Sequence, residues 1–180
     1  MGGVRLLAWL SPTAGREAVD WDAVYREELP RVYNFFRYRV GDRETAEDLT
    51  SITFEKAWCA RDRYRRERAS VSTWLLAIAR NVAVDHYRRP RREVALGQLE
   101  VAAEGTPETQ ALRRAEHERL RALLGSLPAR EREIVAFKYG AGATNRAIAT
   151  LTGLSESNVG TILNRTVGAL RDAWDEGGRP

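Results

Sequence analysis

The sequence predicts an all-α protein in which two small helical domains are joined by a flexible acidic linker. Apolar residues recur three and four positions apart over most of the 180 residues, which is the spacing of one helix face. No segment alternates apolar and polar residues for long enough to predict a strand. Residues 93–112 lose the helical spacing and contain four glutamates and no basic residue. We therefore expect domains at residues 18–92 and 113–176, the linker at 93–112, and a disordered leader at 1–17.

The first domain is expected to begin with a pair of helices, residues 22–29 and 30–40. Pro30 suits a first helical turn, and Gly41 interrupts the pattern after the second helix. Asp42 then stands where it can cap a third helix. The positions of that helix expected to be buried are Ala46, Leu49, either Ile52 or Thr53, Phe54 and Ala57.

Residues 70–89 are expected to form a helix with one buried and one exposed face. Its buried stripe is Val71, Leu75, Ile78, Ala79 and Val82. Asn81, Asp85 and Arg88 lie beside this stripe at the spacing of one helix face. Residues 61–92 contain ten arginines against three acidic residues, a local net charge of +7 in a chain of net charge +4 and sequence pI 9.6. Arginines neutralise phosphates, and Asn and Arg read base edges, so this segment suits nucleic acid. A solvated basic helix is the alternative that the residues alone leave open.

Helical spacing returns at residues 111–124 and 129–139, and the last third of the chain adds a short helix, a turn and a longer helix. The short helix is expected at residues 144–152 and the longer one at 156–169. Gly153 permits a tight turn between them, and Ser155 can cap the second helix. This order is the helix-turn-helix unit, whose second helix lies in the major groove of DNA. An ordinary helical hairpin is the alternative.

The sequence offers no catalytic constellation. His86 and His117 are the only histidines and lack metal-ligand spacing, and there is no glycine-rich phosphate loop. His86 and Cys59, the only cysteine, are both expected to be buried. We therefore expect neither an enzyme nor a cofactor or metal site. A membrane-spanning helix needs about 18 uninterrupted apolar residues, and no run in this sequence approaches that length. We therefore expect a cytoplasmic protein without membrane insertion.

Four blocks carry a resemblance to a known family. They are GDRETAEDLTSITFEKAW, STWLLAIARNVAVDHYRR, LLGSLPAREREIVAFKYG and IATLTGLSESNVGTILNRTVGALR, with the acidic linker between the second and the third. Over residues 22–174 the chain resembles the extracytoplasmic-function (ECF) sigma factors of bacterial RNA polymerase. The resemblance implies a promoter-melting domain followed by a helix-turn-helix domain that reads the upstream promoter element. It also implies core RNA polymerase, promoter DNA and an anti-sigma factor as partners, and a free chain that is monomeric.

The same resemblance assigns roles to individual residues. Polymerase binding falls on Asp48, Leu49, Ser51 and Phe54. Binding of the downstream, minus-ten element falls on Tyr64, Arg80, Asn81, Asp85, Arg88 and Arg89. Binding of the upstream element falls on Ser155, Ser157, Asn158, Thr161, Asn164 and Arg165. Residues 64–73 match a loop that holds a base flipped from the duplex, with Tyr64 and Trp74 as candidate stacking surfaces.

The sequence departs from the family pattern at three positions. Ile52 stands where the family commonly has an acidic residue, and Gly160 and Ile162 stand where it usually has basic ones. Arg165 is the only basic residue between Ser155 and Thr166, so we expect weak binding of upstream DNA. The alternative function is a helix-turn-helix repressor or activator that is not a polymerase subunit. Such a protein is expected to dimerise and to bind a palindrome without polymerase.

Overall fold

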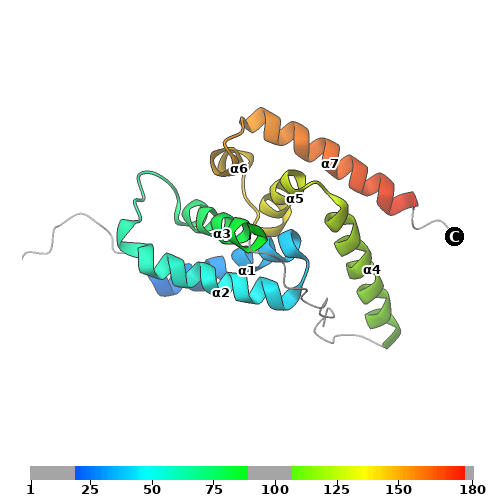
Figure 1. The fold of residues 1–180 in the computed structure, drawn as a ribbon, viewed down its shortest axis with the longest axis horizontal. Helices are drawn as coiled ribbons and strands as arrows, with labels where there is room; N and C mark the ends of the chain where they lie inside the picture. The colour runs from blue at the N-terminus through cyan, green and yellow to red at the C-terminus, as the bar shows by residue number, and fades with distance from the viewer. Residues whose placement is uncertain (1–18, 89–106, 177–180) are drawn as a thin grey trace, which may run out of the picture.

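The computed structural model describes residues 19–88 and 107–176, and within these ranges helices joined by short turns and loops make up the fold, with no strand (Figure 1). The expected leader at residues 1–17 lies outside the described part, as does the expected linker up to residue 106. The helix that follows the linker begins at Pro107 rather than at residue 111, so the end of the expected linker is helical.

The first helical unit consists of three long helices. They are α1 (Trp21–Val40), α2 (Arg43–Ala60) and α3 (Val71–Arg88), with a 3₁₀ turn, η1 (Arg61–Arg63), after α2. Each of the three helices packs against the other two. The apolar side chains buried in this unit are Val32, Phe35, Phe36, Ala46, Leu49, Ala57, Leu75, Leu76, Ala79, Val82 and Ala83.

The expected pair of helices before Gly41 is wrong, because α1 is one continuous helix with Pro30 inside it. Proline has no backbone N–H, so one hydrogen bond of the helix is missing at this point. Pro30 is exposed to solvent, whereas Glu28 and Val32 on either side of it are buried. The packed face of α1 therefore runs past the proline, and tertiary packing outweighs the local break.

The prediction that Asp42 caps α2 is confirmed. Its Oδ2 atom accepts a hydrogen bond from the backbone N–H of Thr45 at 2.7 Å. Burial acts to raise the pKa of the Asp42 carboxyl, but hydrogen bonds from Thr45 and the charge of Arg37 outweigh burial and lower this pKa. Within α2 the choice between two neighbours is decided for Thr53. It is fully buried and donates its hydroxyl to the Leu49 carbonyl at 2.7 Å, whereas Ile52 is exposed.

Two residues expected to be buried are exposed. Cys59 lies on the outer face of α2, one position before its end. His86 is exposed as well, and its neighbour Tyr87 makes the contact to the rest of the unit by donating its hydroxyl to the Arg39 carbonyl at 2.8 Å. In both helices the apolar spacing continues about one turn beyond the part that is buried.

The second helical unit contains the remaining helices. They are α4 (Pro107–Ser126), α5 (Ala129–Val135), a π-helical turn η2 (Ala136–Gly140), α6 (Asn145–Thr152) and α7 (Glu156–Glu176). Figure 1 shows α7 crossing the top of the molecule and α4 running downward beneath the C-terminal half of α7. There the Arg119 guanidinium lies 4.4 Å from the centre of the Trp174 ring.

The helix-turn-helix prediction is confirmed in its local detail. The Thr144 side chain accepts a hydrogen bond from the N–H of Ala147 at 3.2 Å and begins α6. Gly153 ends α6 with φ of 74°, a left-handed conformation that glycine adopts without strain. The hydroxyl oxygen of Ser155 accepts from the N–H of Asn158 at 3.2 Å and caps α7. Helix α7 continues to Glu176, beyond the expected end at residue 169.

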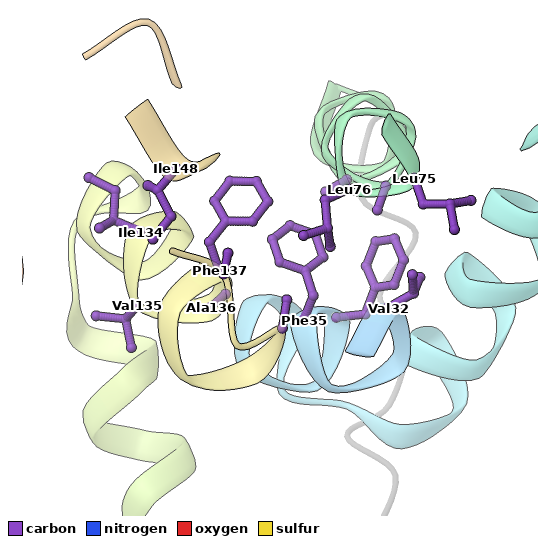
Figure 2. Packing of buried hydrophobic residues seen from close by; sticks show 14 of the residues in the cluster. Val32, Phe35, Leu75, Leu76, Ile134, Val135, Ala136, Phe137 and Ile148 are labelled. Atoms are coloured by element: carbon purple, nitrogen blue, oxygen red, sulfur yellow. The ribbon is translucent and has the colours of Figure 1, made fainter. Parts of the chain in front are cut away.

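The two units share one hydrophobic core. Helix α1 of the first unit packs along α5 and η2 of the second. Figure 2 shows the rings of Phe35 and Phe137 between these elements, with Leu76 of α3 beside them and Ile134 and Ile148 on the far side. The linked-domain pattern in the sequence did not indicate this joint core.

Candidate nucleic-acid and partner interfaces

The two faces of α3 are arranged as the sequence predicts. Asn81, Asp85 and Arg88 are exposed, whereas Leu75 and Val82 are buried in the core. The Asp85 carboxylate lies 3.6 Å from the ammonium of Lys56 on α2, and both side chains are about half exposed. The exposed face therefore presents an amide, a guanidinium and a surface ion pair. The last candidate on this segment, Arg89, lies outside the described residues.

Arg80 differs from the other candidates on α3, because its partner is a buried carboxylate of the second unit. Its Nε atom donates to the Oε1 atom of Glu133 on α5 at 3.1 Å. The Glu133 side chain is only 9% exposed, whereas that of Arg80 is 34% exposed. The pair joins the first helical unit to the second.

Tyr64 is part of an aromatic cluster and not a free ring. Its ring centre lies 6.1 Å from that of Trp21 and 5.2 Å from that of Trp74, and the two indoles lie 5.9 Å apart. Its hydroxyl donates to the Ala69 carbonyl at 3.0 Å, across the base of the loop at residues 64–70, which we call the arginine-rich loop because it contains Arg65, Arg66 and Arg68. Burial raises the pKa of the Tyr64 hydroxyl despite the nearby charge of Arg66. Tyr64 therefore holds the loop in one shape through its ring contacts and its hydrogen bond.

Trp21 is the residue of this cluster that the sequence analysis missed. It is the first residue of α1, and the expected helix began one residue later. The available signal was Asp20, which caps α1 by accepting hydrogen bonds from the N–H groups of Asp22 and Ala23 at 3.1 and 3.0 Å. A cap at Asp20 places Trp21 in the first turn of the helix.

The residues assigned to polymerase binding divide into two groups on α2. Asp48 and Ser51 are exposed, and Phe54 is half-buried with its ring centre 4.8 Å from that of the exposed Tyr25. Leu49 is 5% exposed and packs in the core, so little of its side chain is accessible to a partner in this structure. Leu49 directly follows Asp48, and a step of one residue is enough to turn a side chain from the outer face of a helix to the inner one. Ile52 lies beside Ser51 and is also exposed.

All six candidates on the second helix of the helix-turn-helix are exposed. Arg165 nevertheless has a partner, because its Nη2 atom donates to the Oε1 atom of Glu131 at 2.7 Å. The other carboxylate oxygen of Glu131 accepts from the Thr166 hydroxyl at 3.2 Å. Thr161 donates its hydroxyl to the Ser157 carbonyl at 3.1 Å. The exposed surface of α7 is therefore mainly polar and uncharged where it follows the turn.

The two unusual positions of α7 have different surroundings. A Cβ atom at Gly160 would lie 3.7 Å from the side-chain amide nitrogen of Asn145, which is an ordinary van der Waals contact, so a side chain has room at this position. Ile162 is half-buried and packs against the core. A basic residue at Gly160 would lie near DNA in a helix-turn-helix complex, whereas Ile162 serves packing.

Comparison with known proteins agrees with this division into two units. Residues 24–93 match the family description of sigma-70 region 2, and residues 117–170 match that of sigma-70 region 4. The chain belongs to the ECF sigma factors. Trp21 lies three residues before the residues that match region 2.

Relatives of known name are similar along most of this chain. The ECF sigma factor BldN of Streptomyces coelicolor is 29% identical over 170 residues, which are 92% of this chain and 64% of BldN. The ECF sigma factor SigL of Mycobacterium tuberculosis is 28% identical over 169 residues, 92% of this chain and 94% of SigL. This sigma factor therefore spans about two thirds of one relative and nearly all of the other.

Two solved structures share the fold. The sigma factor RpoE, in complex with the anti-sigma factor NepR from Bartonella quintana, aligns with a TM-score of 0.69 at 21% identity over 87% of this chain and 97% of RpoE. CnrH, in complex with the cytosolic domain of CnrY, aligns with a TM-score of 0.60 at 24% identity over 87% of this chain and 86% of CnrH. Among the described residues, no helix is long and apolar enough to cross a membrane, and no group of three or more His, Cys, Asp or Glu could hold a metal ion.

Proposed function

We propose that this ECF sigma factor binds core RNA polymerase and directs promoter recognition, promoter melting and the initiation of transcription. The observation that carries the proposal is the exposed amide and guanidinium face of α3, which continues from an arginine-rich loop in a chain that matches sigma-70 regions 2 and 4 in order. In this proposal the protein acts in the cytoplasm as a binding subunit and not as an enzyme.

The first unit is proposed to open the downstream promoter element. Arg65, Arg66 and Arg68 on the loop are exposed and can neutralise phosphates, which positions the unit without reading sequence. Asn81 and Arg88 can then donate to base edges. Extruding a base from the duplex costs a few kcal/mol. A loop that Trp21 and the neighbouring rings already hold in one shape loses less conformational entropy when it accepts the base.

The outer face of α2 is proposed to bind polymerase. Asp48 supplies a negative charge, and Ser51, Ile52 and the half-buried Phe54 supply a mixed apolar surface. Ile52 extends the apolar part of this face where family members commonly carry an acid. A contact of this kind depends on shape and apolar burial as well as on charge.

The second unit is proposed to bind the upstream element weakly on its own. Its candidate contacts are mostly hydroxyls and amides, and Arg165 is already paired with Glu131. Because so few cations of this unit can contact phosphates, its binding releases few counterions from DNA. Its affinity for DNA is therefore low and depends only weakly on salt concentration. Polymerase that holds both units at once raises the effective concentration of the weaker contact. An anti-sigma factor is proposed as a further partner, since RpoE and CnrH were each solved in complex with another protein.

The deciding experiment is the purification of the full chain on immobilised core polymerase, followed by mapping of transcription starts after overexpression. A sigma factor is retained by the polymerase and shifts the start sites of a set of promoters. A chain that flows through, dimerises and protects a palindrome without polymerase would establish the repressor or activator alternative.

A further inference from the structure

Arg165 lies on the exposed surface of α7, yet its guanidinium is bonded to a residue of another helix. The Arg165 side chain is 69% exposed, and its Nη2 atom lies 2.7 Å from the Oε1 atom of Glu131. Glu131 stands in the first turn of α5, and only 22% of its side chain is exposed. The carboxylate therefore lies mostly inside the second unit, and the guanidinium extends outward from it.

Glu131 is itself fixed by a second hydrogen bond. Its other carboxylate oxygen, Oε2, accepts from the Thr166 hydroxyl at 3.2 Å. Thr166 directly follows Arg165 in α7 and is only 2% exposed. Hydrogen bonds to an ionised carboxylate are stronger than those between neutral groups, and here each oxygen has one. The buried threonine therefore restrains Glu131, and Glu131 restrains one edge of the Arg165 guanidinium.

A guanidinium that is held at one edge suits the reading of bases. Its N–H donors form a rigid planar fork, so donors that do not bond to Glu131 can still reach a DNA base. A guanine is read by two donors that are placed correctly toward its O6 and N7 atoms. A free arginine must lose rotamer freedom to reach this geometry, whereas Arg165 has already lost part of that freedom on folding.

The same carboxylate weakens the general attraction of Arg165 for DNA. A negative charge next to the guanidinium opposes its interaction with a phosphate, so the pair releases fewer counterions from DNA than a free arginine does. Arg165 is also the only basic residue between Ser155 and Thr166. Glu131 therefore lowers the affinity that depends on charge and favours the contact that depends on direction.

We propose that Glu131 is a positioning residue that determines specificity, because it holds Arg165 in the direction needed to read a G·C base pair of the upstream promoter element. The proposal rests on the proposed function, since it takes Arg165 as a contact of that element. Glu131 itself does not touch DNA and acts through Arg165. Removal of its charge is therefore expected to increase affinity for unrelated DNA and to lower discrimination between base pairs.

The first measurement compares Glu131→Gln with Glu118→Gln in the full chain. Glutamine at residue 131 keeps the length of the side chain and can still accept from Thr166, but it lacks the charge that holds Arg165. Glu118 is exposed on α4, so its substitution makes the same charge change on another helix. Binding to a duplex of unrelated sequence is followed by fluorescence anisotropy over a salt series. Glu131→Gln is expected to steepen the slope of log affinity against log salt by up to about 0.9, the contribution of one phosphate contact, whereas Glu118→Gln leaves the slope unchanged.

The second measurement uses core polymerase and a promoter found by mapping of transcription starts. Each base pair of the upstream element is replaced in turn, and the ratio of the affinities for the original and the replaced duplex gives the discrimination at that position. Arg165→Ala identifies the position that Arg165 reads. There the unsubstituted chain is expected to discriminate about tenfold or more, and Glu131→Gln is expected to lose most of that ratio while it keeps the ratios at other positions.

Thr166→Val provides the test if Glu131→Gln fails to fold, as judged by circular dichroism. It removes the hydroxyl that fixes Glu131 and changes no charge. Discrimination is expected to fall at the same position, with the salt slope unchanged.

A merely structural role of Glu131 has a different signature. It would lower affinity for all duplexes alike and leave the discrimination ratio unchanged, and this result would overturn the positioning proposal alone. If core polymerase does not retain the unsubstituted chain, the proposed function falls and the positioning proposal falls with it.

Discussion

The indole of Trp21 meets the ring of Tyr64 edge to face, with ring centres 6.1 Å apart and planes at 78°. The two residues stand at the first turn of α1 and at the end of η1, far apart in the chain. Trp74 at the start of α3 completes the contact. This cluster joins the starts of α1 and α3 to the loop between α2 and α3, and so it relates the shape of the arginine-rich loop to the packing of the whole first unit.

Trp21→Ala is expected to loosen the loop without unfolding the protein. An aromatic pair contributes about 0.5–1.5 kcal/mol beyond area burial, so stability should fall modestly while amide hydrogen exchange at residues 65–70 speeds up. Promoter opening, followed by permanganate reactivity of unpaired thymines, should decrease with it. Trp21→Phe keeps an aromatic ring and should recover most of the effect. Equal loss of promoter opening in the two variants would contradict a positioning role for the ring cluster.

Asp48→Arg is expected to weaken binding to core polymerase by about tenfold, or about 1.4 kcal/mol, with helicity unchanged. Asp172→Arg makes the same charge change at an exposed position of α7 and should bind normally. Affinities are measured by titration of polymerase into labelled chain. If Asp48→Arg binds as tightly as the control, the outer face of α2 is not the docking surface.

Leu49→Ala should behave differently from its neighbour, because Leu49 is buried. Removing a core leucine costs about 2–5 kcal/mol of folding free energy through lost burial and the cavity left behind. Urea unfolding should record that loss, and polymerase affinity per folded molecule should remain. A stable Leu49→Ala protein with reduced polymerase binding would instead support Leu49 as a polymerase contact.

Asn81→Ala and Val82→Asp separate the two faces of α3. Asn81 is exposed, so its truncation should leave the stability of the protein unchanged. It should make the free energy of promoter-specific opening less favourable by about 1–3 kcal/mol if the amide contacts a base. Val82 is 3% exposed, and an unpaired carboxylate there should unfold the first unit. Thermal unfolding and open-complex assays on both variants give the answer. Loss of stability in Asn81→Ala together with loss of promoter opening alone in Val82→Asp would show that the buried and exposed faces of α3 are the reverse of those described.

Upstream DNA should bind the full chain weakly and with little dependence on salt when polymerase is absent. Arg165→Ala should change the slope of log affinity against log salt by at most about 0.9, the contribution of one phosphate contact. Gly160→Lys places a cation where a side chain has room and should increase both affinity and slope. Fluorescence anisotropy over a salt series measures these values. Nanomolar, steeply salt-dependent binding by the unsubstituted chain would favour an autonomous DNA-binding protein.

The Asp42 cap should stabilise the protein near neutral pH and lose its effect in acid. Because the folded state lowers the pKa of Asp42, its contribution is present above the unfolded pKa of about 3.9 and is lost as pH falls through the lower folded value. Asp42→Ala should cost about 0.5–2 kcal/mol at pH 7, and the difference from the unsubstituted chain should shrink at about pH 3. Urea unfolding at the two pH values checks this, and a difference that grows in acid would contradict it.

The sequence by itself determined the features that depend on neighbours in the chain. The caps at Asp42 and Ser155 and the turn at Gly153 are formed within four residues, so local chemistry is sufficient to predict them. The two faces of α3 follow from helical spacing in the same way. The family was recognisable for a related reason, since its four blocks are local patterns in a set order.

Only the tertiary structure decided the features that join distant segments. Pro30 lies inside a helix because the buried face of α1 continues past it, and Thr53 is buried in place of Ile52 because α2 is rotated toward its neighbours. Phe35 stacks on Phe137, and Arg80 donates to Glu133, although no periodicity in the sequence relates the two residues of either pair. The free energy of such contacts depends on which helices pack together, and a pattern read along one helix contains no information about its partner.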